Sequence, residues 1–296
     1  MQMPDFLVVG AARAGTTSLH SYLRQHPEIF LPRIKEPCFF VFDGDNTEYK
    51  EGKFAFAVRD FNEYENLFRS RKANQITGEM STPYLYLYEK TISRIRNYFP
   101  DYRSIKIVIM LRNPADRAFS QYCWRVRDGR EPLGFQQALD AEKERMLDNF
   151  SFDYFYLDRG FYFKQVKSYI ENFDNVHVIL FEEFKSSPSQ VLRDLCRFLG
   201  VDEHFEFKKV EAQNKSSIPK FKALGKVATM ESKLKYRIWY SIPDSIRKKI
   251  RKWFSDMNEG EKPEMEDATR KMLADLYRED ILALQKLIGR DLTSWL

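Results

Sequence analysis

Residues 5–25, DFLVVGAARAGTTSLHSYLRQ, contain the stretch that decides the fold. Residues 5–9 form a short apolar run, which is typical of a buried strand. Six small or cationic residues, 10–15, come next, and Thr16 begins a segment with apolar residues at helical spacing. A strand, a loop of small residues and a helix N-terminus together favour anion binding, because backbone N–H groups and the helix dipole face the ligand. This stretch therefore predicts an anion-binding loop after the first strand.

The loop is not an intact nucleotide-binding P-loop. That pattern, Gly-x4-Gly-Lys-Ser/Thr, needs a lysine where this chain has Thr16. The only cation in the loop is Arg13, three residues after Gly10. The loop still suits a phosphate or sulfate group, but it lacks the lysine that NTPases place on the β- and γ-phosphates. The alternative is an ordinary tight turn with a surface arginine, and the joint occurrence of strand, loop and helix argues against it.

Strands and helices are expected to alternate along the rest of the chain, which implies a parallel sheet with ligands at the carboxyl ends of its strands. The predicted fold class is α/β, a P-loop-like three-layer fold with a central parallel sheet flanked by helices. We expect one domain, residues 1–296, with a C-terminal helix at 264–288 that docks on the sheet. The other expected strands are 29–31, 75–79, 105–111 and 176–181, and the other expected helices are 60–68, 91–99, one starting at 114, 133–147, 161–173 and 187–199.

Composition narrows the class of protein. The chain has 296 residues and a net charge of +5. It contains no apolar run of membrane-spanning length, and its first strand begins too early for a signal peptide, so we expect a soluble, cytoplasmic protein. Cys38, Cys123 and Cys196 have no paired spacing, and with four scattered histidines they form no metal signature. Reduced, structural thiols and no bound metal are the prediction.

Positive charge is concentrated in a basic, helical region at residues 214–255. This region has twelve Lys or Arg residues against Glu231 and Asp244, so the rest of the chain is net acidic. The pattern indicates an anionic partner, a membrane surface or a solvated basic face. Aromatic and aliphatic residues between the cations are compatible with peripheral contact at the inner face of the membrane, but such a pattern is more often two short helices packed on the domain with Lys and Arg outward. We expect no nucleic-acid partner, and the sequence leaves the oligomeric state open.

A second anion site is predicted after the buried strand at 105–111. Arg112 follows this strand, where a Walker-type NTPase places the Asp that holds Mg²⁺. An arginine suits bidentate contact with a phosphate, although it could instead cap the strand through carboxylates. If Pro114 begins a helix, Ser120 lies within two turns and can add a hydroxyl to the same phosphate. Two phosphate sites without a metal fit 3′-phosphoadenosine 5′-phosphosulfate (PAPS).

The chain resembles the PAPS-dependent sulfotransferases, in particular their carbohydrate and heparan-sulfate branch, as a bacterial cytosolic member. Residues 10–19, GAARAGTTSL, resemble the family's 5′-phosphosulfate loop, and residues 111–122, LRNPADRAFSQY, resemble its 3′-phosphate motif. Residues 35–40, KEPCFF, resemble the segment with the catalytic glutamate, which falls on Glu36. Weaker matches are 78–84 (GEMSTPY), 159–162 (RGFY), 214–217 (NKSS) and 289–295 (GRDLTSW).

This resemblance implies sulfuryl transfer from PAPS to a hydroxyl of a glycan or glycolipid, with adenosine 3′,5′-bisphosphate (PAP) as product. Glu36 would be the general base, and Arg13 would stabilise the departing phosphate. Arg112 and Ser120 would hold the 3′-phosphate. The other implied cofactor-binding residues are Ala14, Gly15, Thr16, Thr17, Ser18, Asn214, Lys215, Ser216 and Ser217. The implied acceptor contacts are Lys35, Ser81, Thr82 and Tyr162.

Three positions depart from the heparan-type pattern. Arg13 stands where a lysine is common, Cys38 replaces a histidine, and Ser81 replaces a lysine before Thr-Pro. The acceptor therefore stays open among polysaccharide, glycolipid and small metabolite. Two other functions also stay open: a metal-dependent P-loop kinase, against which Thr16 and Arg112 argue, and a non-catalytic module that binds anions or a membrane.

Overall fold

The computed structural model describes residues 4–45, 48–52, 54, 56–210 and 263–296. Five strands of this part pair in parallel in the order β2-β3-β1-β4-β5, which confirms the predicted fold class. Strand β1 lies in the middle of the sheet, between β3 and β4. A change in strand order of this kind is where open α/β sheets bind ligands. The strands are β1 (Phe6–Gly10), β2 (Ile29–Phe30), β3 (Ile76–Met80), β4 (Lys106–Leu111) and β5 (Asn175–Leu180).

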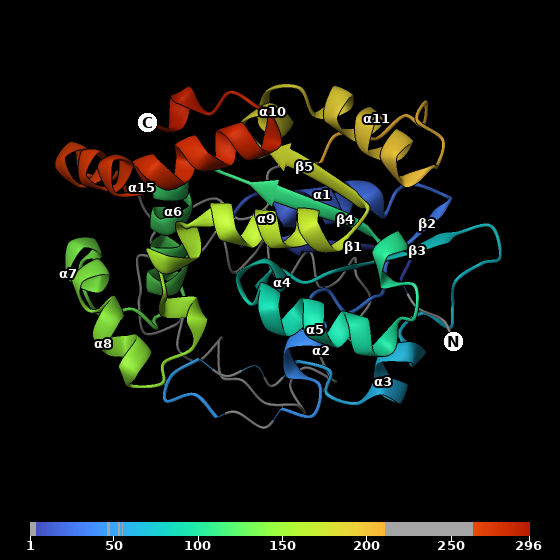
Figure 1. Ribbon diagram of the computed structural model, residues 1–296, viewed down its shortest axis with the longest axis horizontal. Helices are drawn as coiled ribbons and strands as arrows, with labels where there is room; N and C mark the ends of the chain where they lie inside the picture. The colour runs from blue at the N-terminus through green and yellow to red at the C-terminus, as the bar shows by residue number, and fades with distance from the viewer. Residues whose placement is uncertain (1–3, 46–47, 53, 55, 211–262) are drawn as a thin grey trace.

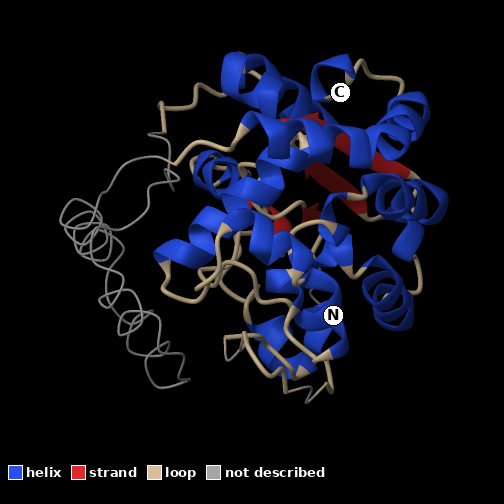
Figure 2. Cartoon of the chain, turned by 90° about the vertical axis from the view of Figure 1, so that its left-hand side faces the viewer, coloured by secondary structure: helices blue, strands red, loops and turns tan. Residues whose placement is uncertain are grey.

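Helices cover both faces of the sheet and complete three layers (Figures 1 and 2). Helices α4, α5 and α9 lie in front of the sheet in Figure 1, and α1 lies behind it. The bounds are α1 (Thr16–Leu23), α2 (Phe39–Phe42), α3 (Phe61–Asn66), α4 (Pro83–Tyr86), α5 (Tyr88–Tyr98), α6 (Pro114–Arg127), α7 (Phe135–Asp140), α8 (Glu142–Leu147), α9 (Tyr162–Asn172), α10 (Phe181–Ser186), α11 (Pro188–Leu199) and α15 (Asp267–Ile288). Helices α2, α4 and α10 were not predicted; α2 and α4 have only four residues each, too few for a helical pattern to emerge.

Two expectations about helices need correction. The predicted helix at 133–147 is two short helices, α7 and α8, which meet at Ala141. Helix α15 packs on α9 and α6 rather than on the sheet. Its carboxylate Asp280 accepts hydrogen bonds from the N–H groups of Tyr162 (2.8 Å) and Phe163 (3.1 Å), at the start of α9. Leu276 of α15 is 44% exposed, so it lies outside the buried face of the helix.

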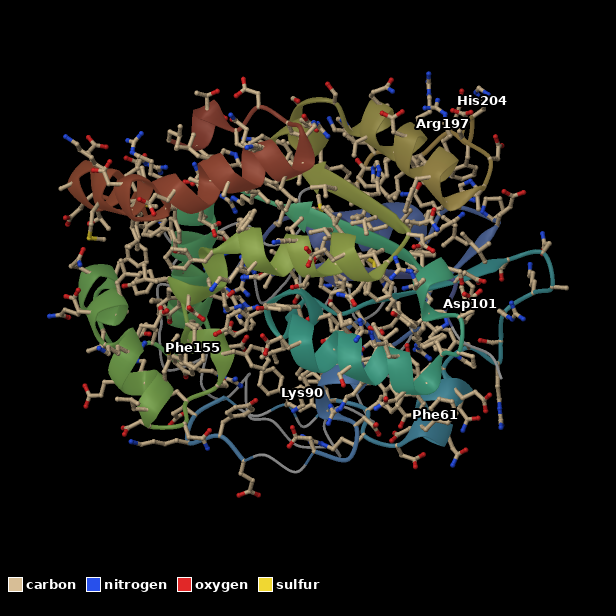
Figure 3. The ribbon with its side chains drawn as sticks, viewed as in Figure 1. Phe61, Lys90, Asp101, Phe155, Arg197 and His204 are labelled. Atoms are coloured by element: carbon tan, nitrogen blue, oxygen red, sulfur yellow. The ribbon has the colours of Figure 1, made fainter. Side chains whose placement is uncertain are left out.

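The basic region at 214–255 and the predicted cofactor contacts Asn214, Lys215, Ser216 and Ser217 lie outside the described residues. Among the residues that the structure does describe, no helix is both long and apolar enough to cross a membrane. The side chains of Arg197, at the end of α11, and His204, just beyond it, point outward (Figure 3).

Strand β1 is closely packed against its neighbours. All five residues of β1 are buried, because helices cover both faces of a parallel sheet. Phe6 pairs in register with Gly78 of β3. A Cβ atom at Gly78 would lie 2.0 Å from Cζ of the Phe6 ring, so a side chain there would displace the ring. Glycine at this position lets the ring lie across β3.

A carboxylate lies in the core at the end of β3. Glu79 is 1% exposed, and its oxygens accept hydrogen bonds from the hydroxyls of Ser81, Tyr84 (2.9 Å) and Tyr64 (3.1 Å). Burial raises the pKa of Glu79 to about 7. The three hydrogen bonds from hydroxyls act in the opposite direction, because they favour the ionised form. The core of this protein therefore contains a group that titrates near neutral pH.

We expect Glu79 to make stability depend on pH. Its pKa is about 7 in the fold, against an ordinary value of 4.5, so the folded protein binds the proton more tightly than the unfolded chain. This contribution is present at low pH and is lost as the pH rises through about 7. Urea unfolding gives the free energy of unfolding of the wild type and of Glu79→Gln. Relative to the variant, the wild type should lose about 3 kcal/mol of this free energy between about pH 5 and pH 8. A constant difference would contradict the assignment.

Candidate functional site

Three neighbouring strands end at the same edge of the sheet, and each continues into a predicted site segment. Residues 11–15 follow β1, Thr82 lies two residues after the end of β3, and Arg112 follows β4. The N–H group of Ser81 donates to the carbonyl of Val8 (3.1 Å), which ties the end of β3 to β1. The structure thus brings together motifs that lie about a hundred residues apart in the sequence.

The loop after β1 turns sharply into α1. Gly15 is the N-cap residue of α1 and has a φ of 94°. A Cβ atom there would lie 2.9 Å from the ring of Phe181, so both conformation and space require glycine. Because Gly15 has no side chain, it leaves the first N–H groups of α1 uncapped for an anion. Local geometry agrees with the predicted anion loop.

Arg13, Ser120 and Arg112 form one hydrogen-bonded group. Arg13 Nε donates to Ser120 Oγ at 3.2 Å. Arg112 Nη1 donates to the carbonyl of Arg13, also at 3.2 Å. In the described part of the chain, the buried Nε of Arg112 has no hydrogen-bond partner. The two predicted phosphate-binding elements are therefore in direct contact, and one of their donors is left unsatisfied.

This group carries more positive than negative charge. Burial, followed by the cations Arg127 and Arg112, lowers the pKa of Arg13 to about 10, and Asp128 only partly opposes the shift. Burial also lowers the pKa of Arg112. The Arg13 guanidinium stays charged at neutral pH, because a pKa of about 10 is well above it. An anion bound here would offset the cost of keeping these charges away from water.

Glu36 lies on the other side of the same loop. One carboxylate oxygen accepts from Lys35 Nζ (2.7 Å), and the other accepts from Thr82 Oγ1 (3.1 Å). Lys35 Nζ also donates to Thr17 Oγ1 (3.2 Å), in the first turn of α1. The Glu36 side chain is 25% exposed, so a ligand can reach it. The ion pair with Lys35 shows that this glutamate has a structural partner as well as an accessible position.

Two predicted acceptor contacts are placed differently. Ser81 is fully buried, and its hydroxyl donates to Glu79 and accepts from the N–H of Cys38 (2.9 Å). Tyr162 is also fully buried, and its hydroxyl donates to the carbonyl of Arg112 (3.1 Å). Both side chains support the backbone of the site, and neither is placed to touch an acceptor. Sequence spacing could not show which way these side chains point.

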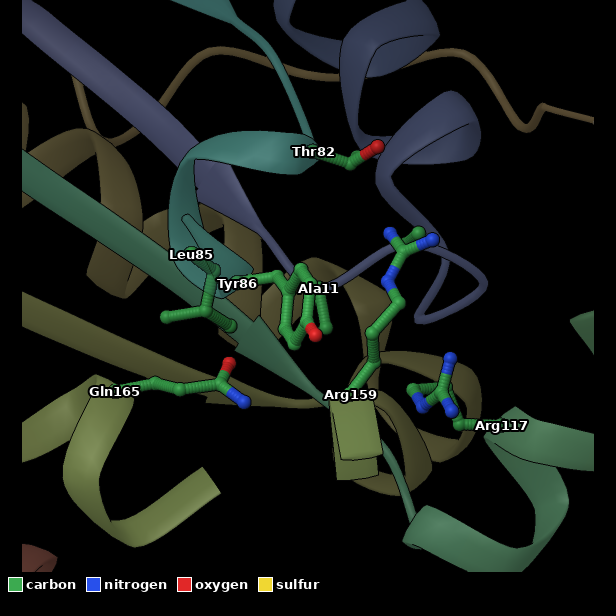
Figure 4. A pocket seen from close by; sticks show the side chains of 8 residues that line it. Ala11, Thr82, Leu85, Tyr86, Arg117, Arg159 and Gln165 are labelled. Atoms are coloured by element: carbon green, nitrogen blue, oxygen red, sulfur yellow. The ribbon is translucent and has the colours of Figure 1, made fainter. Parts of the chain in front are cut away.

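A small cavity adjoins the site, and its two arginines were missed as site residues. Its volume is about 10 Å³, room for a group the size of one water molecule. Figure 4 shows Arg117 and Arg159 close together near Ala11. Arg117 is fully buried, and its Nε and Nη1 have no partner among the described residues. The RGFY match hinted at Arg159, but no pattern singled out Arg117. The lining residues are Ala11, Ala12, Thr82, Leu85, Tyr86, Arg117, Arg159 and Gln165.

Known proteins are similar to this chain in sequence, and a solved structure is also similar in fold. A sulfotransferase from Alicyclobacillus acidocaldarius, known from its crystal structure, is 35% identical, with a TM-score of 0.75 and coverage of 100% of this chain and 99% of that chain. The membrane-associated sulfotransferase kil1 of Dictyostelium discoideum is 24% identical, over 72% of this chain and 59% of its own length. Bifunctional heparan sulfate N-deacetylase/N-sulfotransferase 1 of Xenopus tropicalis is 24% identical, over 100% of this chain and 31% of its own length.

The chain thus spans less than two thirds of the length of these two curated relatives. Residues 4–206 match the family described as the sulfotransferase family. That range contains all five strands of the described sheet and the group formed by Arg13, Arg112 and Ser120, with Glu36 beside it. The chain belongs to the sulfotransferase family.

Proposed function

We propose that this chain takes PAPS as its donor and transfers the sulfuryl group to a hydroxyl of a carbohydrate or glycan. The observation that carries this proposal is the cationic group of Arg13, Arg112 and Ser120 at the N-terminus of α1, with Glu36 on the other side of the same loop. A site with positive charge on one side and an accessible carboxylate on the other suits transfer from an anionic donor to a hydroxyl.

The hydrogen-bond donors and cations of the site fit a molecule with phosphate groups at two positions. Residues 14–18, at the start of α1, would hold the 5′-phosphosulfate. Arg112 and Ser120 would hold the 3′-phosphate, and the Nε of Arg112, which has no partner among the described residues, supports an anion there. PAPS, when bound, supplies a sulfuryl group attached to a phosphate that can leave.

The chain's own residues would move the proton and stabilise charge. Each Glu36 oxygen accepts one hydrogen bond and keeps a lone pair for the proton of the acceptor hydroxyl. Lys35 and Thr82 would hold that carboxylate in a fixed orientation. Arg13 and the N–H groups at the start of α1 would stabilise the negative charge that develops on the leaving phosphate.

The acceptor is proposed to be a glycan or glycolipid. Support comes from relatives whose names refer to heparan sulfate. We also propose a single cytoplasmic domain that needs no metal and contacts anionic membrane through residues 214–255, and the name of the relative kil1 supports a membrane contact. Among the described residues, no group of three or more His, Cys, Asp or Glu is arranged to hold a metal.

Ligand binding should separate this proposal from a P-loop kinase. We expect PAP to raise the melting temperature of the wild type, and ATP with Mg²⁺ to leave it nearly unchanged. Arg112→Ala should weaken PAP binding about tenfold or more, because a charge-assisted phosphate contact is lost. Arg278→Ala, an exposed arginine on α15, is the control and should bind as the wild type does. Stabilisation by ATP with Mg²⁺ instead of PAP would contradict the proposal.

The role of Glu36 can be measured separately. Glu36→Gln should lower kcat by roughly 100-fold, because the amide cannot accept the proton, and it should leave PAP affinity intact. Glu171→Gln, an exposed glutamate on α9, is the control. Radiolabelled PAPS with desulfated heparan sulfate as a first acceptor gives the assay, and a glycan panel follows if turnover is low. An unchanged kcat in Glu36→Gln would contradict the assignment of Glu36 as the general base.

A further inference from the structure

A buried carboxylate is linked to the segment that carries Glu36. Ser81 donates its hydroxyl proton to Glu79, and the same oxygen accepts from the N–H of Cys38 at 2.9 Å. An ionised carboxylate can only accept hydrogen bonds, so above about pH 7, where Glu79 is mainly ionised, it fixes the direction in which the Ser81 proton points. The lone pairs of Ser81 are then left for the backbone N–H two residues after Glu36.

A second hydroxyl repeats this arrangement. Tyr84 donates to Glu79 Oε2 at 2.9 Å and accepts from the N–H of Phe40 at 3.2 Å. Glu79, Ser81, Tyr84 and Phe40 are all at most 1% exposed, so water does not compete for these bonds. One carboxylate thus orients two hydroxyls, and each hydroxyl holds one backbone N–H of the segment at residues 36–40.

This segment requires support from its neighbours. Glu36 has a φ of 61° and Cys38 a φ of 54°, a left-handed conformation that residues with a Cβ adopt at a cost. Such a conformation persists only where surrounding contacts hold it. The N–H of Glu36 donates to the carbonyl of Met80 (3.1 Å), so the end of β3 and the residues after it hold the segment at residues 36, 38 and 40.

We propose that Glu79, acting through Ser81 and Tyr84, is a positioning residue that keeps Glu36 where it can take the acceptor proton. This inference rests on the proposed function of Glu36 as the base. Glu79 itself does not touch the reacting groups, since it lies in the core behind the segment. A misplacement of about 1 Å in a reacting group can cost about 100-fold in rate, so a loss of this support should appear in kcat.

Tyr64 offers a matched control. Its hydroxyl donates to the same Glu79 oxygen at 3.1 Å, and no bond from it to the backbone of residues 36–40 occurs in the described structure. Its ring stacks on Phe39 with the centroids 4.4 Å apart. Tyr64→Phe therefore removes one hydrogen bond to Glu79, keeps the packing and leaves both links to the segment in place.

The experiment compares Glu79→Gln, Ser81→Ala, Tyr64→Phe and Glu36→Gln with the wild type. We expect Glu79→Gln and Ser81→Ala to lower kcat about tenfold or more, with the KM for PAPS and the affinity for PAP within about twofold. Tyr64→Phe should keep kcat within about twofold. Hydrogen exchange at the N–H groups of residues 36 and 38–40 should speed up in Glu79→Gln and Ser81→Ala and not in Tyr64→Phe, a readout that needs no acceptor substrate.

The outcomes distinguish the two proposals. If Glu36→Gln loses turnover while Glu79→Gln and Ser81→Ala keep it, the positioning role is wrong and the base assignment stands. An equal fall in Tyr64→Phe would mean that general packing is responsible, which also overturns the inference. If Glu36→Gln keeps its turnover, the base assignment fails and the inference fails with it. Melting temperatures show whether each variant folds. If Glu79→Gln does not fold, Ser81→Ala still tests the inference.

Discussion

The parallel pairing of β1 with both β3 and β4 is the constraint on which the site depends. Parallel strands end at the same edge, so the loop after β1, Thr82 and Arg112 meet there without any long connection. Tight packing keeps this register, because Phe6 of β1 occupies the space left by Gly78 of β3. Arg13, Thr82 and Arg112, which make polar contacts of the site, all lie on segments that follow these paired strands.

Within that frame, opposite charges lie on either side of one loop. Arg13 and Arg112 lie toward α6, whereas Glu36 lies toward the end of β3. Lys35 connects the two sides, since its ammonium group contacts both Glu36 and Thr17 of α1. A bound anion and the carboxylate can therefore share one cation, which limits their mutual repulsion.

The sequence predicted the features that local patterns determine. Apolar runs identified the strands, and Thr16 and Pro114 marked the starts of two helices, because strand burial and helix starts leave local signals. The direction of the side chains after β3 could not be predicted from the sequence. Nothing in GEMSTPY shows that Ser81 faces the core and Thr82 faces Glu36. The burial of Arg117 was equally hidden, since an arginine on an amphipathic helix usually faces water.

The unsatisfied donors of this site have a consequence for the protein's lifetime. Arg112 Nε, and Arg117 Nε and Nη1 in the adjoining cavity, are buried without a partner among the described residues, and Arg13 is partly removed from water among other cations. Unpaired buried donors lower the stability of the fold, and any anion that binds only the folded form raises that stability. Degradation acts on the unfolded fraction, so an anion that binds the folded form would also lengthen the lifetime of each copy in the cell.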